Sequence, residues 1–205
     1  KPSLRTRVTF EVAMQALGGN SLFMDLRGEH IGQREPIADV ARNLDRWVHA
    51  ITARVFKHST VEQLAQWARI PVINALCDTV HPCQALADVL TIHDVFGKLA
   101  GVRVAYVGDG NNVAHSLMLT GAKLGMHVAV ATPAGYEPNQ KIVQQAREFA
   151  HKTGGSITTS HDAEGTVNGA QVVYTDVWTS MGSEHRSEEH TSELQSHLNL
   201  VCRLL

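Results

Sequence analysis

The sequence lacks the features that mark membrane-spanning and secreted proteins. No run approaches the about 18 to 20 consecutive apolar residues that a transmembrane helix needs, and the first ten residues lack the apolar segment of a signal peptide. Only three cysteines are present, Cys77, Cys83 and Cys202, and they form no CxxC or paired spacing, which favours a reducing compartment. We therefore expect a cytoplasmic protein with no membrane partner.

The charge balance shows no excess of either sign. The 18 Lys and Arg residues are balanced by 20 Asp and Glu residues, which gives a net charge of −2. Such a chain has no general field that attracts nucleic acid, so any anion must be bound by a local cluster of basic residues. Because 43% of the 205 residues are hydrophobic, the chain can bury an ordinary globular core, which excludes disorder and collagen.

Apolar periodicity predicts helices alternating with strands over residues 1–185. Helices are expected at 4–17, 36–49, 61–68, 82–95, 113–124 and 140–152, and strands or short apolar runs at 21–25, 53–56, 71–76, 102–107, 127–131, 156–159 and 171–174. This alternation implies parallel sheets covered by helices. We predict an α/β fold with two α/β domains, residues 1–97 and 98–185, each with a mainly parallel sheet flanked by helices, the second Rossmann-like.

Residues 186–205 do not continue this pattern. The segment Arg186-Ser-Glu-Glu-His-Thr-Ser-Glu-Leu-Gln-Ser-His197 has no sustained apolar period, and it resembles a common sequencing adapter translated in frame. We therefore treat 186–205 as a non-native tail and leave it out of the fold. The alternative is a genuine polar tail that ends in a short apolar helix over 198–205.

Two motifs in the first half are suited to binding a small phosphorylated ligand. Ser3-Leu4-Arg5-Thr6-Arg7 lies where a helix begins, so free backbone N–H groups, hydroxyls and guanidinium groups converge as a phosphate requires. His81-Pro82-Cys83-Gln84 opens another helix and places an imidazole and an amide on one face, which suits a carbamoyl group. Each motif also fits a plain helix cap, and Cys83 fits a small buried hydrophobe.

Two motifs in the second half follow predicted strands, at the sheet edge where α/β proteins bind ligands. Gly108-Asp-Gly-Asn-Asn112 lacks the third glycine of a dinucleotide fingerprint and offers amides that can bind a carboxylate instead. In Tyr174-Thr-Asp-Val-Trp-Thr-Ser-Met-Gly182, Asp176 and Ser180 can receive an ammonium group. A structural turn and a strand-ending Asx-turn are the alternatives.

The order and spacing of these motifs resemble the aspartate/ornithine carbamoyltransferase family over essentially all of residues 1–185. The first two motifs are similar to the family's Ser-Thr-Arg-Thr-Arg and His-Pro-x-Gln motifs, and the segment Arg34-Glu-Pro-Ile-Ala-Asp-Val-Ala-Arg42 also looks like the family's sequence. The motifs Gly108–Asn112 and Asp176–Gly182 look like those that separate ornithine-specific members from aspartate-specific ones.

The resemblance implies an enzyme that transfers the carbamoyl group of carbamoyl phosphate to the δ-amine of L-ornithine, giving L-citrulline and phosphate in arginine metabolism. It implies a homotrimer and no metal or other cofactor. The implied carbamoyl phosphate site comprises Ser3, Leu4, Arg5, Thr6, Arg54, His81 and Gln84, with His30 supplied by a neighbouring subunit. The implied catalytic residues are Arg5, His81 and Gln84. The implied ornithine site comprises Asn112, Asp176, Ser180 and Met181.

Two departures from the family pattern matter. Leu4 stands where threonine is commoner, so the phosphate loop has one hydroxyl fewer. The family's His-Cys-Leu-Pro segment and final helix would follow Gly182, where the adapter-like run stands instead. We therefore expect a truncated enzyme that is itself inactive. The alternatives are a carbamoyltransferase for another amine, such as acetylornithine or putrescine, and a non-catalytic nucleotide-binding module.

Overall fold

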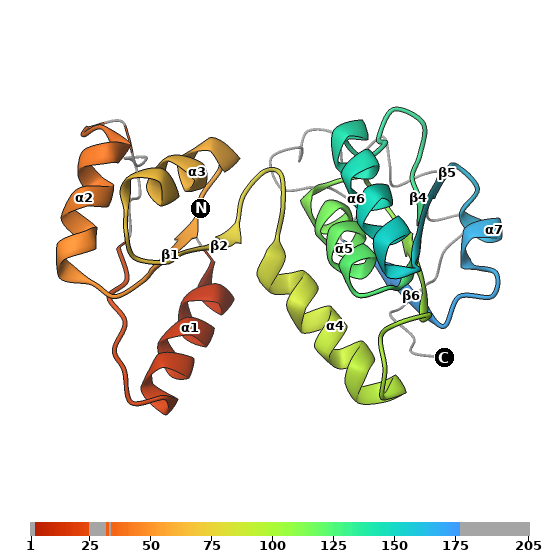
Figure 1. Ribbon diagram of the computed structural model, residues 1–205, viewed down its shortest axis with the longest axis horizontal. Helices are drawn as coiled ribbons and strands as arrows, with labels where there is room; N and C mark the ends of the chain where they lie inside the picture. Colours follow the sequence, from red (N-terminus) through yellow and green to blue (C-terminus); the bar gives the residue numbers. More distant parts are fainter. Residues whose placement is uncertain (1–2, 25–31, 33, 177–205) are drawn as a thin grey trace. The chain divides into compact units, whose positions relative to one another are not determined.

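The computed structural model describes residues 3–24, 32 and 34–176 (Figure 1). The contacts between residues divide the chain into two compact units, one ending at Asp78 and the other beginning at Thr79. Helix α4 (Pro82–Phe96) precedes the domain boundary that the sequence predicts after residue 97, yet it packs on α5 (Asn112–Lys123) of the second unit. The compact units and the predicted domains therefore have different limits, and the domain assignment stays a prediction.

The first unit is built around one parallel strand pair. It contains α1 (Leu4–Ala16), α2 (Ile37–Trp47), β1 (Ile51–Arg54), α3 (His58–Trp67) and β2 (Val72–Leu76). β1 and β2 pair with Ile51 opposite Val72, and α3 makes the crossover that a parallel connection requires. Leu64 of α3 is fully buried, and Ala53 of β1 and Ala75 of β2 are buried in the same unit.

Residues 21–24, the described part of the strand predicted at 21–25, do not form a strand. The described part of this segment, 21–24, has no regular secondary structure, and residue 25 lies outside the described residues. An extended apolar run becomes a strand only when a neighbouring strand pairs with its backbone groups, and no strand of the described chain pairs with this one. The Phe23 ring instead lies under the guanidinium of Arg7, 4.4 Å from its carbon to the ring centroid.

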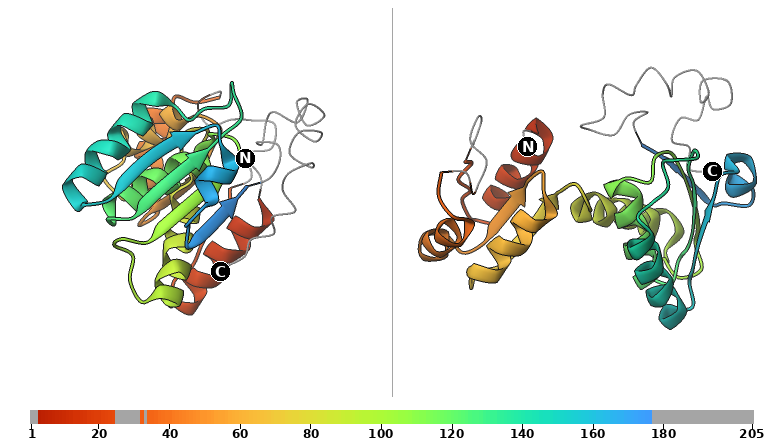
Figure 2. Two further views of the ribbon diagram at one scale, coloured as in Figure 1. Left: turned by 90° about the vertical axis from the view of Figure 1, so that its right-hand side faces the viewer. Right: turned by 90° about the horizontal axis from the view of Figure 1, so that it is seen from above.

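The second unit has a four-stranded parallel sheet in the order β5-β4-β3-β6. Its elements are α4, β3 (Arg103–Val107), α5, β4 (His127–Ala131), α6 (Gln140–Thr153), β5 (Ser156–Ser160), α7 (Ala163–Val167) and β6 (Val172–Thr175). Helices α5 and α6 cover one face of the sheet and α7 lies on the other, as the view from above shows (Figure 2). The sequence did not predict α7.

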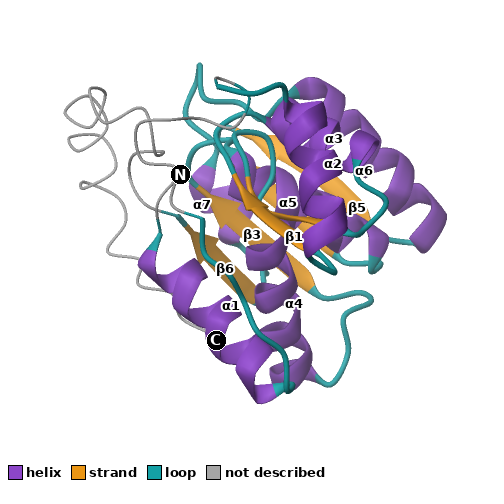
Figure 3. Ribbon diagram, turned by 90° about the vertical axis from the view of Figure 1, so that its left-hand side faces the viewer, coloured by secondary structure: helices purple, strands orange, loops and turns teal. Residues whose placement is uncertain are grey.

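From α2 onward helices and strands alternate, and the strands of each unit pair in parallel, which confirms the predicted α/β class with parallel sheets flanked by helices (Figure 3). Within the described ranges, every helix is too short or too polar to cross a membrane.

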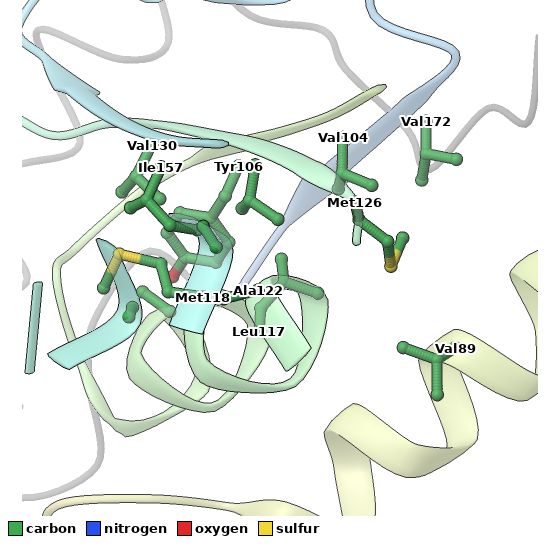
Figure 4. Close-up of a cluster of buried hydrophobic side chains, with 14 of the residues drawn as sticks. Val89, Val104, Tyr106, Leu117, Met118, Ala122, Met126, Val130, Ile157 and Val172 are labelled. Atoms are coloured by element: carbon green, nitrogen blue, oxygen red, sulfur yellow. The ribbon is translucent and has the colours of Figure 1, made fainter. Parts of the chain in front are cut away.

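The core of the second unit lies between α5 and the sheet. Leu117, Met118 and Ala122 of α5 are at most 1% exposed, and they pack against strand residues that include Val104 and Val130 (Figure 4). The sheet is covered here, so the two central strands, β3 and β4, read as largely apolar runs rather than as alternating ones. This packing fixes the turn between β3 and α5, where one candidate site motif lies.

Candidate active site

The start of α1 is held together by hydroxyl groups and one arginine. Ser3 caps the helix, because its Oγ accepts a hydrogen bond from the backbone N–H of Thr6 at 3.4 Å. The Thr6 hydroxyl donates to the Ser3 Oγ at 3.1 Å, and Arg54 Nη1, at the end of β1, donates to Thr6 Oγ1 at 3.2 Å. The structure therefore brings together Ser3, Thr6 and Arg54, three of the residues that the family resemblance assigns to the phosphate.

The positive charges of Arg5 and Arg54 act on each other at this helix start. Burial lowers the pKa of Arg54 from its ordinary value, and the positive charge of Arg5 lowers it further. Because like charges repel, an anion bound at the amino end of α1 would relieve this repulsion and would also meet the positive end of the helix dipole. Leu4 is 77% exposed, so the residue that departs from the family pattern points into solvent.

The start of α4 is anchored on α5. His81 is the N-cap residue of α4, and its backbone N–H donates to the Ser116 Oγ at 2.6 Å. The neighbouring His115 is 7% exposed; its Nδ1 lies 2.8 Å from the carbonyl oxygen of Thr79, and its Nε2 accepts from the Asn139 N–H at 2.9 Å. These contacts assign the proton to Nδ1 and a neutral ring. Burial lowers the pKa of His115, which favours the same state.

Gln84, one turn further along α4, is tied to a carboxyl group. Its Nε2 donates to Asp88 Oδ1 at 2.9 Å. Burial raises the pKa of Asp88, hydrogen bonds from the Gln84 and Tyr174 side chains lower it, and the negative charge of Asp176 raises it again. Asp176 and Gln84 therefore act on the same carboxyl group, although the sequence assigned them to different substrates.

The two asparagines in the turn between β3 and α5 have different structural roles. Asn111 is the N-cap of α5, since its Oδ1 accepts from the N–H groups of Val113 (2.9 Å) and Ala114 (3.2 Å). Its Nδ2 donates to Asp176 Oδ2 at 2.9 Å, which fixes the end of β6 beside the start of α5. Asn112, the predicted ornithine ligand, is the first residue of the helix and is half-buried.

Gly110 is required in this turn by a close approach of the chain. Its N–H donates to the Tyr136 carbonyl at 2.8 Å, and a Cβ at this position would overlap the backbone of Glu137 and Pro138. Gly110 belongs to the motif that partly resembles a dinucleotide-binding fingerprint, and its absence of a side chain serves packing here.

Two tyrosines line the buried side of this cluster. The Tyr106 and Tyr174 rings are stacked with centroids 5.9 Å apart, and the Tyr106 hydroxyl donates to the Asp109 carbonyl at 2.9 Å. Burial raises the pKa of Tyr106, with a further contribution from the charge of Asp176. The raised pKa keeps the Tyr106 hydroxyl protonated, so that it remains a hydrogen-bond donor to Asp109.

The predicted residues thus form two groups, each within one unit. Ser3, Arg5, Thr6 and Arg54 gather at the start of α1, and His81, Gln84, Asn112 and Asp176 belong to the second unit. His30, Ser180 and Met181 lie outside the described residues. Sequence reasoning missed Asp88, His115, Ser116 and Tyr174. Of these, only Asp88 carried a signal, because it stands four residues after Gln84 on a predicted helix.

Comparison with known proteins matches both halves of the chain. A family model described as the aspartate/ornithine carbamoyltransferase carbamoyl-P binding domain matches residues 1–94. A second one, for the Asp/Orn binding domain of the same family, matches residues 100–199. The second match includes part of the segment 186–205, whose exclusion from the fold stays a prediction.

Individual proteins similar to this chain belong to the family that the two models describe. An ornithine carbamoyltransferase of Anoxybacillus flavithermus is 54% identical over 189 residues, which cover 92% of this chain and 60% of that protein. One of Bacillus thuringiensis subsp. konkukian is 47% identical over 213 residues, covering 100% of this chain and 67% of that protein.

The solved structure of ornithine carbamoyltransferase from Pyrococcus furiosus superposes with a TM-score of 0.88 at 55% identity, covering 92% of this chain and 60% of that one. The chain thus spans about 60% of the length of the first relatives it matches. With both domain models matched in order and these identities, the chain belongs to the aspartate/ornithine carbamoyltransferase family.

Proposed function

We propose that the chain is part of an enzyme that transfers the carbamoyl group of carbamoyl phosphate to the δ-amine of L-ornithine, releasing L-citrulline and phosphate in arginine metabolism. The observation that carries the proposal is the cluster at the start of α1: Arg54 Nη1 donates to Thr6 Oγ1 at 3.2 Å, and burial and then the charge of Arg5 lower the pKa of Arg54. Two repelling cations at a helix amino end suit a dianionic phosphate group.

The proposed chemistry assigns each group a task. The neutral δ-amine attacks the carbamoyl carbon, the bond from that carbon to the phosphate oxygen breaks, and the amine loses a proton as phosphate leaves. Arg5 contacts both the phosphate and the carbonyl oxygen on which negative charge develops. A fixed donor at such an oxygen contributes about 3 to 4 kcal/mol to catalysis. Ser3, Thr6 and Arg54 hold the phosphate, and His81 and Gln84 hold the carbamoyl end.

The amino acid is assigned to the second unit. Asn112 and Asp176, together with Ser180 and Met181, bind the α-amino and carboxylate groups of ornithine in this proposal. The proposed role of Asp176 is supported by its position, because Asn111 Nδ2 donates to Asp176 Oδ2 at 2.9 Å and holds the carboxylate beside the start of α5. We further propose a homotrimer in the cytoplasm, with His30 reaching the site of a neighbouring subunit.

Calorimetry on the 205-residue chain tests the proposal without requiring turnover. We expect saturable binding of carbamoyl phosphate, and at least about tenfold weaker binding in Arg5→Ala, because a charged contact is lost. Asp176→Asn should leave carbamoyl phosphate binding nearly unchanged and weaken binding of ornithine when carbamoyl phosphate is present. Saturable binding of NAD with no response to carbamoyl phosphate would overturn the proposal in favour of a nucleotide-binding module.

A further inference from the structure

The Gln84 side chain is presented in one of its two possible orientations. Gln84 and Asp88 are four residues apart on α4 and share a helix face, with Gln84 Nε2 2.9 Å from Asp88 Oδ1. An ionised carboxylate only accepts hydrogen bonds, so the group that meets Asp88 must be the NH2 end of the amide. The amide is planar, and its oxygen therefore points away from Asp88.

Asp88 is partly buried and has one oxygen on the amide. The Tyr174 side chain of β6 lowers the pKa of the Asp88 carboxyl group, and the Tyr174 ring stacks on the buried Tyr106. Asp88 Oδ2 is shielded from solvent and meets no hydrogen-bond donor among the described residues. The contact from Gln84 Nε2 to Asp88 Oδ1 is therefore the one through which the carboxylate can orient the amide.

We propose that Asp88 is a positioning residue that locks the Gln84 amide with its oxygen toward the ligand, so that the site selects a group that donates from NH2. The inference rests on the proposed function, since it assigns Gln84 to the carbamoyl end. It adds a source of selectivity: a carbamoyl group donates to the Gln84 oxygen, whereas an acetyl group of nearly the same shape offers only a methyl group. Leaving a polar group of the site unpaired is what rejects such an analogue.

The test compares the dissociation constants of carbamoyl phosphate and acetyl phosphate, measured by calorimetry on the 205-residue chain. In the wild type we expect carbamoyl phosphate to bind at least about tenfold more tightly than acetyl phosphate. Asp88→Leu, which removes the acceptor, should bring this ratio close to one. Asp88→Asn retains an acceptor oxygen, so it should keep most of the wild-type preference for carbamoyl phosphate over acetyl phosphate. Inorganic phosphate, which has no NH2 group, should bind equally to all variants.

A matched control lies on the same helix. Asp94 has a side chain 70% exposed and only a long contact to His93 (3.9 Å), so Asp94→Asn should leave the ratio unchanged. Gln84→Leu should lower the ratio as much as Asp88→Leu does, and the double variant should lower it no further, because Asp88 acts through Gln84. A merely structural role of Asp88 would weaken both ligands alike and leave the ratio intact.

A second measurement separates this inference from the proposed function. In nitrogen-15 NMR spectra of the wild type, the Gln84 Nε2 protons should exchange slowly with water, and in Asp88→Leu, or in Asp88→Asn to a smaller extent, they should exchange faster. A wild-type chain that binds no carbamoyl phosphate would overturn the proposed function, while protected Gln84 protons would still support the locked amide. Unprotected protons in the wild type, or an unchanged ligand ratio in Asp88→Leu, would overturn the inference.

Discussion

Helices α1 and α5 each begin with a capping side chain beside candidate ligand-binding groups, yet α1 buries none of its residues whereas α5 buries seven. At α1 the groups are held by local hydroxyl contacts and by one hydrogen bond from Arg54. At α5 the cap, Asn111, is tied to Asp176 and the helix behind it is packed into the core. The contrast indicates that the candidate groups at α5 are placed by the packed fold, while those at α1 depend on charge and on a lightly packed helix.

The largest expected effect is a loss of stability when a buried residue of α5 is truncated. Leu117→Ala should lower the free energy of unfolding of the second unit by about 3 kcal/mol, because Leu117 is 1% exposed and the substitution leaves a cavity. Val12→Ala on the exposed α1 should cost less than about 0.5 kcal/mol. Urea titration with hydrogen exchange of β3 and α1 peptides measures both. Equal costs would show that α1 is packed as firmly as α5.

The two capping residues sharpen the comparison. Asn111→Ala should cost about 2 kcal/mol, because the α5 cap and the hydrogen bond to Asp176 are lost together. Ser3→Ala should cost about 1 kcal/mol, since its cap contact is longer and its helix is exposed. Thermal unfolding followed by circular dichroism gives both values. A larger loss in Ser3→Ala than in Asn111→Ala would reverse the assigned order.

Most elements of the second unit were predictable, because β3, β4 and β6 are largely apolar runs between clear turn and cap signals, whereas the five-residue α7 was not predicted. The strand His127–Ala131 and the helix starting at residue 140 match the predicted limits. The predicted strand at 21–25 was wrong because apolar character alone does not supply a pairing partner. β1 starts at Ile51, two residues before the prediction, because its pairing with β2 begins there. Pairing is a long-range property that a local pattern does not contain.

In the candidate site, too, local features were predictable from the sequence and contacts between distant residues were not. The sequence indicated the motifs that begin helices, since caps and turns are local, and the structure places Ser3, Thr6 and Arg54 in contact. It could not indicate that Tyr174 and Gln84 meet at Asp88, because these residues come from separate elements. Nor could it distinguish Asn111, which caps α5, from Asn112, which follows it.

A smaller effect is expected on the pH dependence of stability, through the buried His115 of α5. Burial lowers the pKa of His115 below 6.5, so below that pH the unfolded chain binds a proton that the folded chain does not. The wild type should therefore lose stability as the pH falls from 7 to 5, by up to about 1.4 kcal/mol per pH unit for this group. His115→Gln should show a shallower slope in urea titrations over this range. Parallel slopes would show that His115 is protonated in the folded state.

The smallest effect is expected for Arg7, which stands two residues after Arg5 in the first motif. Arg7 Nε contacts Glu11 Oε1 at 2.9 Å and its guanidinium covers the Phe23 ring, so it is turned to the surface of α1. Arg7→Gln should cost about 0.5 kcal/mol of stability, as an exposed helix pair does, and should change carbamoyl phosphate affinity by less than about twofold. Arg5→Gln, the matched variant two residues earlier, should weaken that affinity at least about tenfold. Calorimetry on both variants measures the difference. Equal weakening would mean that the α1 site draws on the summed charge of the helix start rather than on Arg5 beside Arg54, and the proposed role of Arg5 would be lost.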